Sequence, residues 1–159
     1  MINRLITFEG IDGSGKSTQI KLLEKKLSLN NIQYISIREP GSANVSEEIR
    51  NILLDKKNSN MSFKTEMLLF LSARAQIVKE EIIPALNNNK FVLCDRFIDS
   101  TVAYQGYGRG LNLDLINNLN VFVTNNIRPQ KTFIFDVTEE DSMQRIHKQK
   151  DRMESGGLE

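Results

Sequence analysis

One segment near the start of the chain has the residue types and spacing of a phosphate-binding loop. Residues 10–17 read Gly-Ile-Asp-Gly-Ser-Gly-Lys-Ser and match the pattern G-x-x-x-x-G-K-[ST]. Glycines let the backbone wrap closely around an anion, so that N–H groups point at phosphate oxygens. The lysine of this pattern reaches the outer phosphates of a nucleotide, and the hydroxyl that follows it is a magnesium ligand. The segment therefore predicts binding of ATP with Mg²⁺. The residues that we expect to bind ATP are Gly10, Ile11, Asp12, Gly13, Ser14, Gly15, Lys16, Ser17 and Thr18.

Two alternatives for this segment are a chance glycine-rich turn with a surface lysine and a dinucleotide site. The chance turn is disfavoured because the segment lies between a strand-like run and a helical pattern, which is the context that the loop requires. The dinucleotide site is disfavoured because G-x-G-x-x-G does not fit, and a Lys-Ser pair has no role in such a site.

Charged residues follow two other strand-like runs. Asp95 ends the run 91–95, and an acid at the end of a buried strand near a phosphate loop is placed to organise magnesium, together with Ser17. The alternative for Asp95 is a cap of the next turn. Arg38 follows the second run and could hold a phosphate with two parallel hydrogen bonds, whereas a solvated arginine is the alternative.

Phe70 and Arg74 are one helical turn apart in a helical pattern, so both point the same way. A ring that stacks on a base and a guanidinium that hydrogen-bonds its edge would form a nucleobase site. Apolar neighbours crowd the same region, and Phe70 as a plain core residue is the alternative.

A basic cluster lies near the end of the chain: Arg145, His147, Lys148, Lys150 and Arg152. Its functional interpretation is a lid that closes cations over ATP and excludes water. Its ordinary interpretation is a solvated helix face. We interpret His147 as a surface residue and not as a general base.

The elements that must position these residues alternate between strands and helices. We expect strands at 5–8, 32–37, 91–95 and 131–136, and helices at about 17–29, 46–54, 63–86 and 113–122, with another after Thr138. The segment 96–110 is expected to be loop and short helix. The run 91–94 is continuously apolar, which is typical of a parallel strand covered on both faces, and Cys94 within it is expected to be buried. The pattern predicts an α/β fold with a parallel sheet flanked by helices in three layers.

Composition limits the possible partners. The chain has 159 residues, which suits a single domain, and its formal net charge of +1 gives no global attraction to nucleic acid or to anionic membranes. No apolar stretch approaches the ~20 residues of a membrane span. The start of the chain has no secretory pattern, and one cysteine allows no intrachain disulfide. We therefore expect a cytoplasmic protein with no nucleic-acid or membrane partner.

Taken together, these segments resemble thymidylate kinase. The matching pieces are residues 8–18, 38–41, 66–70 with Arg74, 95–96 with 100–101 and 103–106, and 151–154. The run 95–110 discriminates best, because the phosphate loop is shared with many nucleotide-binding proteins. The resemblance covers essentially the whole chain and implies a P-loop NTPase fold.

The resemblance implies roles for the matched positions. Lys16 would hold the ATP phosphates, Asp12 would lie near the 3′-hydroxyl of the acceptor sugar, and Arg38 and Arg96 would grip the acceptor phosphate. The residues that would bind dTMP are Asp12, Arg38, Phe70, Arg74, Arg96, Ser100, Thr101, Tyr104 and Gln105. Among them, Phe70 would stack on thymine, Arg74 would hydrogen-bond its carbonyl edge, Thr101 and Gln105 would contact the base, and Tyr104 would disfavour a 2′-hydroxyl.

One branch of the family carries an arginine inside the phosphate loop, whereas this chain has Ser14 there and resembles the branch whose lid supplies the cation. Arg145 and Arg152 are the candidates for that cation. The catalytic residues are then Lys16, Arg96, Asp12, Arg145 and Arg152. The lid would span about 142–157 of a single nucleoside-monophosphate kinase domain, 1–159.

The chain departs from the family pattern in two places. Gly41, Ser42 and Ala43 stand where Gly-Gly-Thr is usual. Family members also continue past the lid with a helix, a fifth strand and a final helix, so we expect a domain without its last strand and helices.

The function expected from the resemblance is ATP-dependent phosphorylation of dTMP to dTDP by a homodimer. One alternative is a P-loop kinase for another nucleoside monophosphate or a nucleoside. The other is a non-catalytic, regulatory ATP-binding module, against which the arginines on the acceptor side argue.

Overall fold

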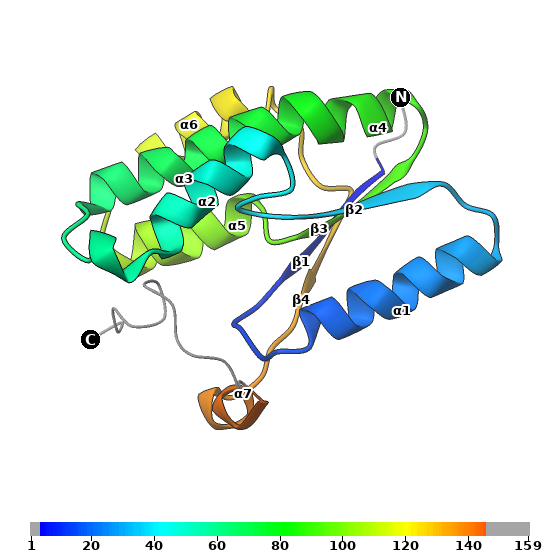
Figure 1. The fold of residues 1–159 in the computed structure, drawn as a ribbon, viewed down its shortest axis with the longest axis horizontal. Helices are drawn as coiled ribbons and strands as arrows, with labels where there is room; N and C mark the ends of the chain where they lie inside the picture. Colours follow the sequence, from blue (N-terminus) through cyan, green and yellow to red (C-terminus); the bar gives the residue numbers. More distant parts are fainter. Residues whose placement is uncertain (1–3, 146–159) are drawn as a thin grey trace.

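A parallel sheet forms the centre of the structure, a computed structural model that describes residues 4–145 (Figure 1). Within those residues the sheet has four strands in the order β2-β3-β1-β4, and every neighbouring pair is parallel. The strands are β1 (Leu5–Glu9), β2 (Tyr34–Arg38), β3 (Phe91–Asp95) and β4 (Lys131–Ile134). The predicted parallel α/β architecture is confirmed.

The helices are α1 (Lys16–Leu29), α2 (Asn44–Leu54), α3 (Phe63–Ile77), α4 (Ile83–Asn87), α5 (Ile98–Thr101), α6 (Leu113–Val123) and α7 (Glu139–Arg145). A 3₁₀ turn, η1 (Lys56–Asn58), and two π-helical segments, η2 (Val78–Ile82) and η3 (Val102–Gly108), complete the described elements. In Figure 1, α1 covers one face of the sheet, and the layer from α2 to α6 covers the other. The helix α7 lies at the end of the sheet where α1 begins (Figure 1).

The central strand β3 divides its side chains between two cores. Val92 and Cys94 are fully buried against the layer of α3, η2 and α4, whereas Leu93 is fully buried with Phe8 and Ile20 under α1. This division follows from the alternation of side chains along a strand, and it explains why the run is apolar at every position. The expected burial of Cys94 is confirmed, and burial raises the pKa of its thiol well above 9.0.

Two expected elements differ in detail. The single helix expected over 63–86 is three consecutive segments, because the π-helical η2 separates α3 from α4. Pro84 stands in the first turn of α4 and has no N–H to donate to the preceding turn. The missing donor allows the wider hydrogen-bond spacing of a π-helix in η2, directly before α4. The segment 96–110, expected to be loop and short helix, is mostly helical as α5 and η3.

Smaller differences concern the ends and faces of elements. The second strand lies at Tyr34–Arg38 rather than 32–37. Phe122, next to last in α6, is 77% exposed. Thr138 does cap α7, since its Oγ1 accepts a hydrogen bond from the backbone N of Asp141 at 3.1 Å.

Within 4–145, no helix is long and apolar enough to cross a membrane.

Candidate active site

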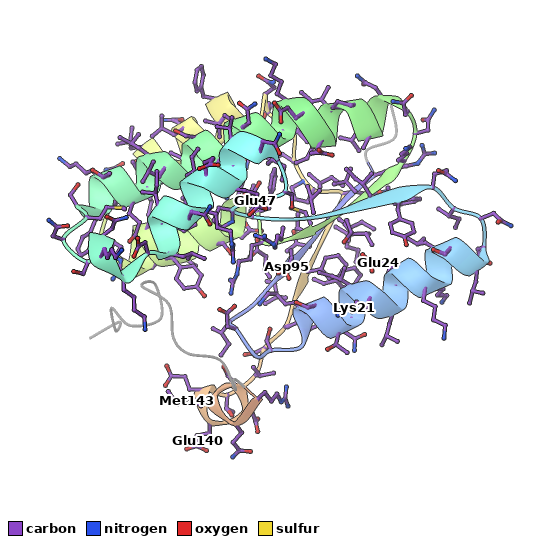
Figure 2. The ribbon with its side chains drawn as sticks, in the orientation of Figure 1. Lys21, Glu24, Glu47, Asp95, Glu140 and Met143 are labelled. Carbon is purple, nitrogen blue, oxygen red and sulfur yellow. The ribbon has the colours of Figure 1, made fainter. Side chains whose placement is uncertain are left out.

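The predicted site residues converge because strands β1, β2 and β3 end at the same edge of the sheet. Asp95 pairs in register with Phe8 of β1 and with Arg38 of β2. The loops that follow these strands therefore open side by side at the carboxyl ends of the strands, where open α/β sheets bind ligands. Figure 2 shows Asp95 in the middle of the molecule, between α1 on one side and α2 and α3 on the other.

The phosphate loop depends on glycine at two positions for different reasons. Gly10 has a φ of +141°, and a Cβ there would lie 2.6 Å from the carbonyl oxygen of Phe135, so the loop packs against the backbone that follows β4. Gly15 has a φ of +98° with no atom within 4 Å of the Cβ position, so backbone conformation alone requires glycine there. Because Gly15 is also the N-cap of α1, the loop leads into the positive end of that helix.

Lys16 lies inside the loop and is only 5% exposed. Its Nζ donates to the carbonyl oxygens of Gly10 and Ile11 at 2.8 and 2.9 Å and lies 3.8 Å from Asp12 Oδ1. Burial lowers the pKa of Lys16, and the nearby charge of Arg96 lowers it further. A cation in this position can neutralise an anion bound by the loop.

Ser17 and Asp95, the expected magnesium pair, are in contact. The hydroxyl of Ser17 donates to Asp95 Oδ2 at 3.2 Å. Hydroxyl and carboxylate oxygens suit Mg²⁺, which is usually held by one or two protein ligands together with water and substrate phosphates. Accordingly, residues 4–145 contain no cluster of three or more acidic, histidine or cysteine ligands for a metal.

Arg96 connects the loop after β3 to the phosphate loop. Its Nη2 forms an ion pair with Asp12 Oδ1 at 2.5 Å, and its Nη1 lies 3.4 Å from both Ser100 Oγ and Tyr104 Oη. Burial on its own lowers the pKa of Arg96, but Tyr104, Asp12 and Asp95 outweigh that effect, so the pKa is raised. The guanidinium therefore stays charged beside the loop.

Glu9, to which the sequence alone assigned no role, lies under this arginine. Its two carboxylate oxygens accept hydrogen bonds from the backbone N of Phe97 at 2.7 Å and from Ser100 Oγ at 2.6 Å. Burial raises the pKa of Glu9, although both hydrogen bonds act in the opposite direction. An acid at the end of a buried strand was the signal that singled out Asp95, and the same signal applies to Glu9 at the end of β1.

Arg38 is held in place by residues of its own loop and of α2. Its Nη2 contacts both carboxylate oxygens of Glu47 at 3.1 Å, and its Nη1 donates to the carbonyl oxygen of Pro40 at 3.1 Å. A hydrogen bond from the backbone of Ser42 lowers the pKa of Glu47, and Arg38 lowers it further. The guanidinium remains about half exposed, so it is accessible to an anion.

Arg74 lies deeper than expected for a residue that contacts a base. It is 2% exposed, and its Nε and Nη2 both lie 2.7 Å from Glu39 Oε2. Its Nη1 donates to Thr101 Oγ1 at 2.8 Å and to Asn120 Oδ1 at 2.7 Å, and Nη2 also donates to the carbonyl oxygen of Phe97. All five N–H groups of the guanidinium are thus engaged within the protein, and its contact with a base stays a prediction.

The remaining expected base contacts surround this arginine. Thr101 and Gln105 are each 1% exposed, and Gln105 Nε2 donates to Glu66 Oε1 at 3.0 Å. Phe70 is partly buried and belongs to none of the described core clusters, and its stacking on a base stays a prediction.

The start of the expected lid packs against the phosphate loop. Ser142 Oγ donates to the carbonyl oxygen of Asp12 at 2.5 Å, and Arg145 Nη1 lies 3.5 Å from the carbonyl oxygen of Gly13. No sequence pattern had singled out Ser142. Arg152 and the rest of the basic cluster lie outside the described residues, so their roles stay predictions.

Comparisons with known proteins agree on one family. The family model described as thymidylate kinase matches residues 8–156. The thymidylate kinase of Clostridium novyi is 48% identical over 147 residues, which cover 92% of this chain and 72% of that protein. That of Kosmotoga olearia is 49% identical over 144 residues, covering 91% of this chain and 69% of that protein.

A solved structure agrees as well. The crystal structure of thymidylate kinase from Ehrlichia chaffeensis superposes with a TM-score of 0.76 at 42% identity, over 96% of this chain and 82% of that chain. The chain is thus shorter than the relatives that it matches.

Proposed function

The chain belongs to the thymidylate kinase family, and we propose that it transfers the γ-phosphoryl group of ATP to dTMP, giving dTDP and ADP. One observation carries the proposal: Lys16 in the phosphate loop and Arg96 on the neighbouring strand loop both face Asp12, at 3.8 and 2.5 Å. A cation for the donor phosphates and a cation for the acceptor phosphate therefore meet at one carboxylate.

The reaction needs no strong general base, because the acceptor is already an anionic phosphate oxygen. Catalysis is then positioning together with neutralisation of charge in the transition state. Lys16 and the loop amides hold the ATP phosphates, and Arg38 and Arg96 hold the phosphate of dTMP. Ser17 and Asp95 would hold Mg²⁺ together with ATP, and the bound metal would neutralise charge on the phosphates.

The base and the sugar of dTMP bind next to Arg96. Phe70 stacks on thymine, while Arg74, Thr101 and Gln105 form the polar side of the pocket. Ser100 and Tyr104 lie beside the sugar, and the phenol of Tyr104 disfavours a 2′-hydroxyl. The buried contacts of Arg74 and Gln105 support a pocket of fixed shape.

The lid supplies the remaining cation, since the phosphate loop carries Ser14 and no arginine. The approach of Arg145 to Gly13 at 3.5 Å supports this residue as one candidate, and Arg152 is the other. This assignment goes with the branch of the family that has no arginine in the loop.

The first experiment is an ADP-release assay with dTMP, dUMP, AMP and GMP as acceptors. We expect dTMP to be the best acceptor, and Lys16→Ala to lower kcat at least about a hundredfold because it removes charge from the transition state. Lys21→Ala is the matched control, since this lysine is exposed on α1 (Figure 2), and we expect it to keep full activity. Near-normal turnover of Lys16→Ala would refute the assignment, and a better acceptor than dTMP would refute the proposed pocket.

The assembly that we propose is a cytoplasmic homodimer formed through helices of the α2–α6 layer. Exposed apolar side chains on those helices support it, including Leu68 on α3 at 52% exposure and Phe122 on α6 at 77%. Sedimentation of the chain should give the mass of a dimer, and Leu68→Glu should shift it to a monomer. An unchanged dimer in that variant would place the interface elsewhere.

A further inference from the structure

The turn after β3 holds Arg96 in a backbone conformation that an arginine avoids. Its φ is +69°, in the left-handed region that favours glycine. A strained residue of this kind persists only where its surroundings determine it, and such residues cluster at functional sites. In this chain the strained residue is also the one whose guanidinium reaches Asp12 across the site.

The contacts that fix this turn come from the end of β1. The backbone N of Arg96 donates to the carbonyl oxygen of Phe8 at 2.9 Å. The next backbone N, that of Phe97, donates to Glu9 Oε1 at 2.7 Å, and Ser100 Oγ donates to Glu9 Oε2 at 2.6 Å. One carboxylate therefore holds the turn on the far side of Arg96 at two points.

Because position 9 is buried, the presence of a glutamate there needs a physical explanation. Glu9 is 6% exposed, and an ionised carboxylate in such a place is costly unless it is hydrogen-bonded and near opposite charge. An apolar residue would fill the space beneath the turn but would leave the N–H of Phe97, which is fully buried, without its acceptor. The carboxylate is thus explained by what it holds rather than by packing alone.

We propose that Glu9 is a positioning residue for phosphoryl transfer, which fixes the turn 96–100 so that Arg96 and Ser100 present the acceptor phosphate to the phosphate loop. This inference rests on the proposed function, because it names how the acceptor side of that site is held. Glu9 touches neither nucleotide and acts through the turn.

The proposal predicts that changes at Glu9 affect the acceptor and not the donor. Without the carboxylate the turn relaxes, and Arg96 moves relative to the loop. A displacement of about 1 Å can cost about a hundredfold in rate, so Glu9→Ala should lower kcat/KM for dTMP by about that factor. The loop keeps its own contacts through Gly10 and Lys16, so KM for ATP should stay within about twofold of the wild-type value.

The conservative variant provides a rescue. In Glu9→Gln the amide oxygen can still accept from the N–H of Phe97, and the amide nitrogen can donate to Ser100 Oγ, whose hydroxyl also accepts. We expect this variant to recover most of the loss. Glu24→Gln is the control, because this glutamate lies on α1 away from the turn (Figure 2). It should leave both substrates unaffected.

The experiment measures kcat and both KM values for the four proteins, together with amide hydrogen exchange at Phe97. Selective loss toward dTMP in Glu9→Ala, recovery in Glu9→Gln and faster exchange at Phe97 only in Glu9→Ala would support the proposal. Equal changes in both KM values, or unchanged kinetics, would overturn it.

A wild-type chain without dTMP-dependent ADP release would instead count against the proposed function. In that case the role of Glu9 in holding the turn 96–100 is tested by NMR measurements alone. Glu9→Ala should then speed exchange at Phe97 and shift the Nε–H signal of Arg96, and the absence of both changes would overturn the role of Glu9.

Discussion

Carboxylates hold the basic residues of this site at the level of single side chains. Asp12 contacts both Lys16 and Arg96, and Glu47 holds Arg38 with two hydrogen bonds. Breaking an ion pair between exposed side chains changes the free energy of unfolding little, whereas breaking a buried pair lowers it strongly. The same type of contact therefore has different consequences at different depths of the site.

The buried pair of Arg74 and Glu39 should be important for stability. Breaking a buried pair leaves an uncompensated charge and costs about 3–5 kcal/mol, so Glu39→Met should lower the free energy of unfolding by that amount. The double variant Glu39→Met with Arg74→Met should recover part of it, because both charges are then absent. Urea unfolding of the two single variants and the double variant measures the coupling.

The pair of Arg38 and Glu47 is the matched control for that cycle. Its side chains are 47% and 39% exposed, and an exposed pair contributes about 0–1 kcal/mol, so Glu47→Met should change stability little. Similar losses from Glu39→Met and Glu47→Met would contradict the argument from burial.

Glu9 should leave a signature in the pH dependence of stability. Its folded-state pKa is raised above 4.5, chiefly by burial, with Asp99 contributing in the same direction and Arg96 in the opposite one. Between 4.5 and the raised pKa, the folded protein binds more protons than the unfolded chain, so this group makes stability fall as pH rises. The difference in unfolding free energy between wild type and Glu9→Gln should therefore change across that window and level off above it. A difference that is constant from pH 4 upward would contradict the raised pKa.

The limits of prediction from sequence are clearest at this scale. The phosphate loop was predictable because its chemistry is encoded in residues 10–17, which are adjacent in the chain. The roles of Glu9 and Glu39 were not, because the partners of Glu9 lie 88 and 91 positions away and the partner of Glu39 lies 35 away. The depth of Arg74 was missed for the same reason, since its burial depends on elements packed from α2 to α6.

At the scale of elements, periodicity predicted the strands and most helices but not the two π-helical segments. Hydrophobic spacing does not distinguish a π-helical turn from an α-helical one when the run is short. One of these segments, η3 (Val102–Gly108), carries Tyr104 and Gln105, so part of the proposed pocket is set by a geometry that spacing alone does not encode.

The helix α7 should depend mainly on the shorter of its two described hydrogen bonds to the phosphate loop. Ser142 is 5% exposed and donates to the carbonyl oxygen of Asp12, while α7 is short and makes few other described contacts with the loop. Ser142→Ala should therefore speed amide exchange across Glu139–Arg145, because short helices depend on tertiary contacts for their stability. Met143→Ala is the control, since Met143 is 61% exposed on the same helix (Figure 2). Equal protection in both variants would show that Asp12 does not anchor α7.

At the scale of the whole molecule, the helices described within 4–145 cover the two faces of the sheet unequally. Among the described elements, α1 alone packs on one face, and it lies over β1, β2 and β3. The strand β4 ends the described sheet, with Phe133 and Ile134 at 41% and 76% exposure. The fold was predictable from the alternation of strands and helices, but uneven coverage depends on packing between elements and not on their order.

Among the described residues, an apolar groove lies between α1 and β4. Its volume is about 330 Å³, and its lining consists of Phe8, Gln19, Leu23, Phe133 and Phe135. Phe8 and Phe133 stack with their ring centroids 5.7 Å apart and form the aromatic wall of the groove. Apolar grooves are typical binding sites for small apolar molecules.

We expect the groove to bind the dye ANS, whose fluorescence rises in apolar surroundings. Leu23→Glu should abolish most of that signal, because it places a charge in the lining opposite the phenylalanines. Leu29→Glu is the control: it lies on the same helix, is 75% exposed and lines no part of the groove, so it should leave the signal unchanged while adding the same charge. If both variants lowered the fluorescence equally, the dye would be responding to net charge. If neither did, the dye would bind elsewhere, and the groove between α1 and β4 would not act as an apolar surface in solution.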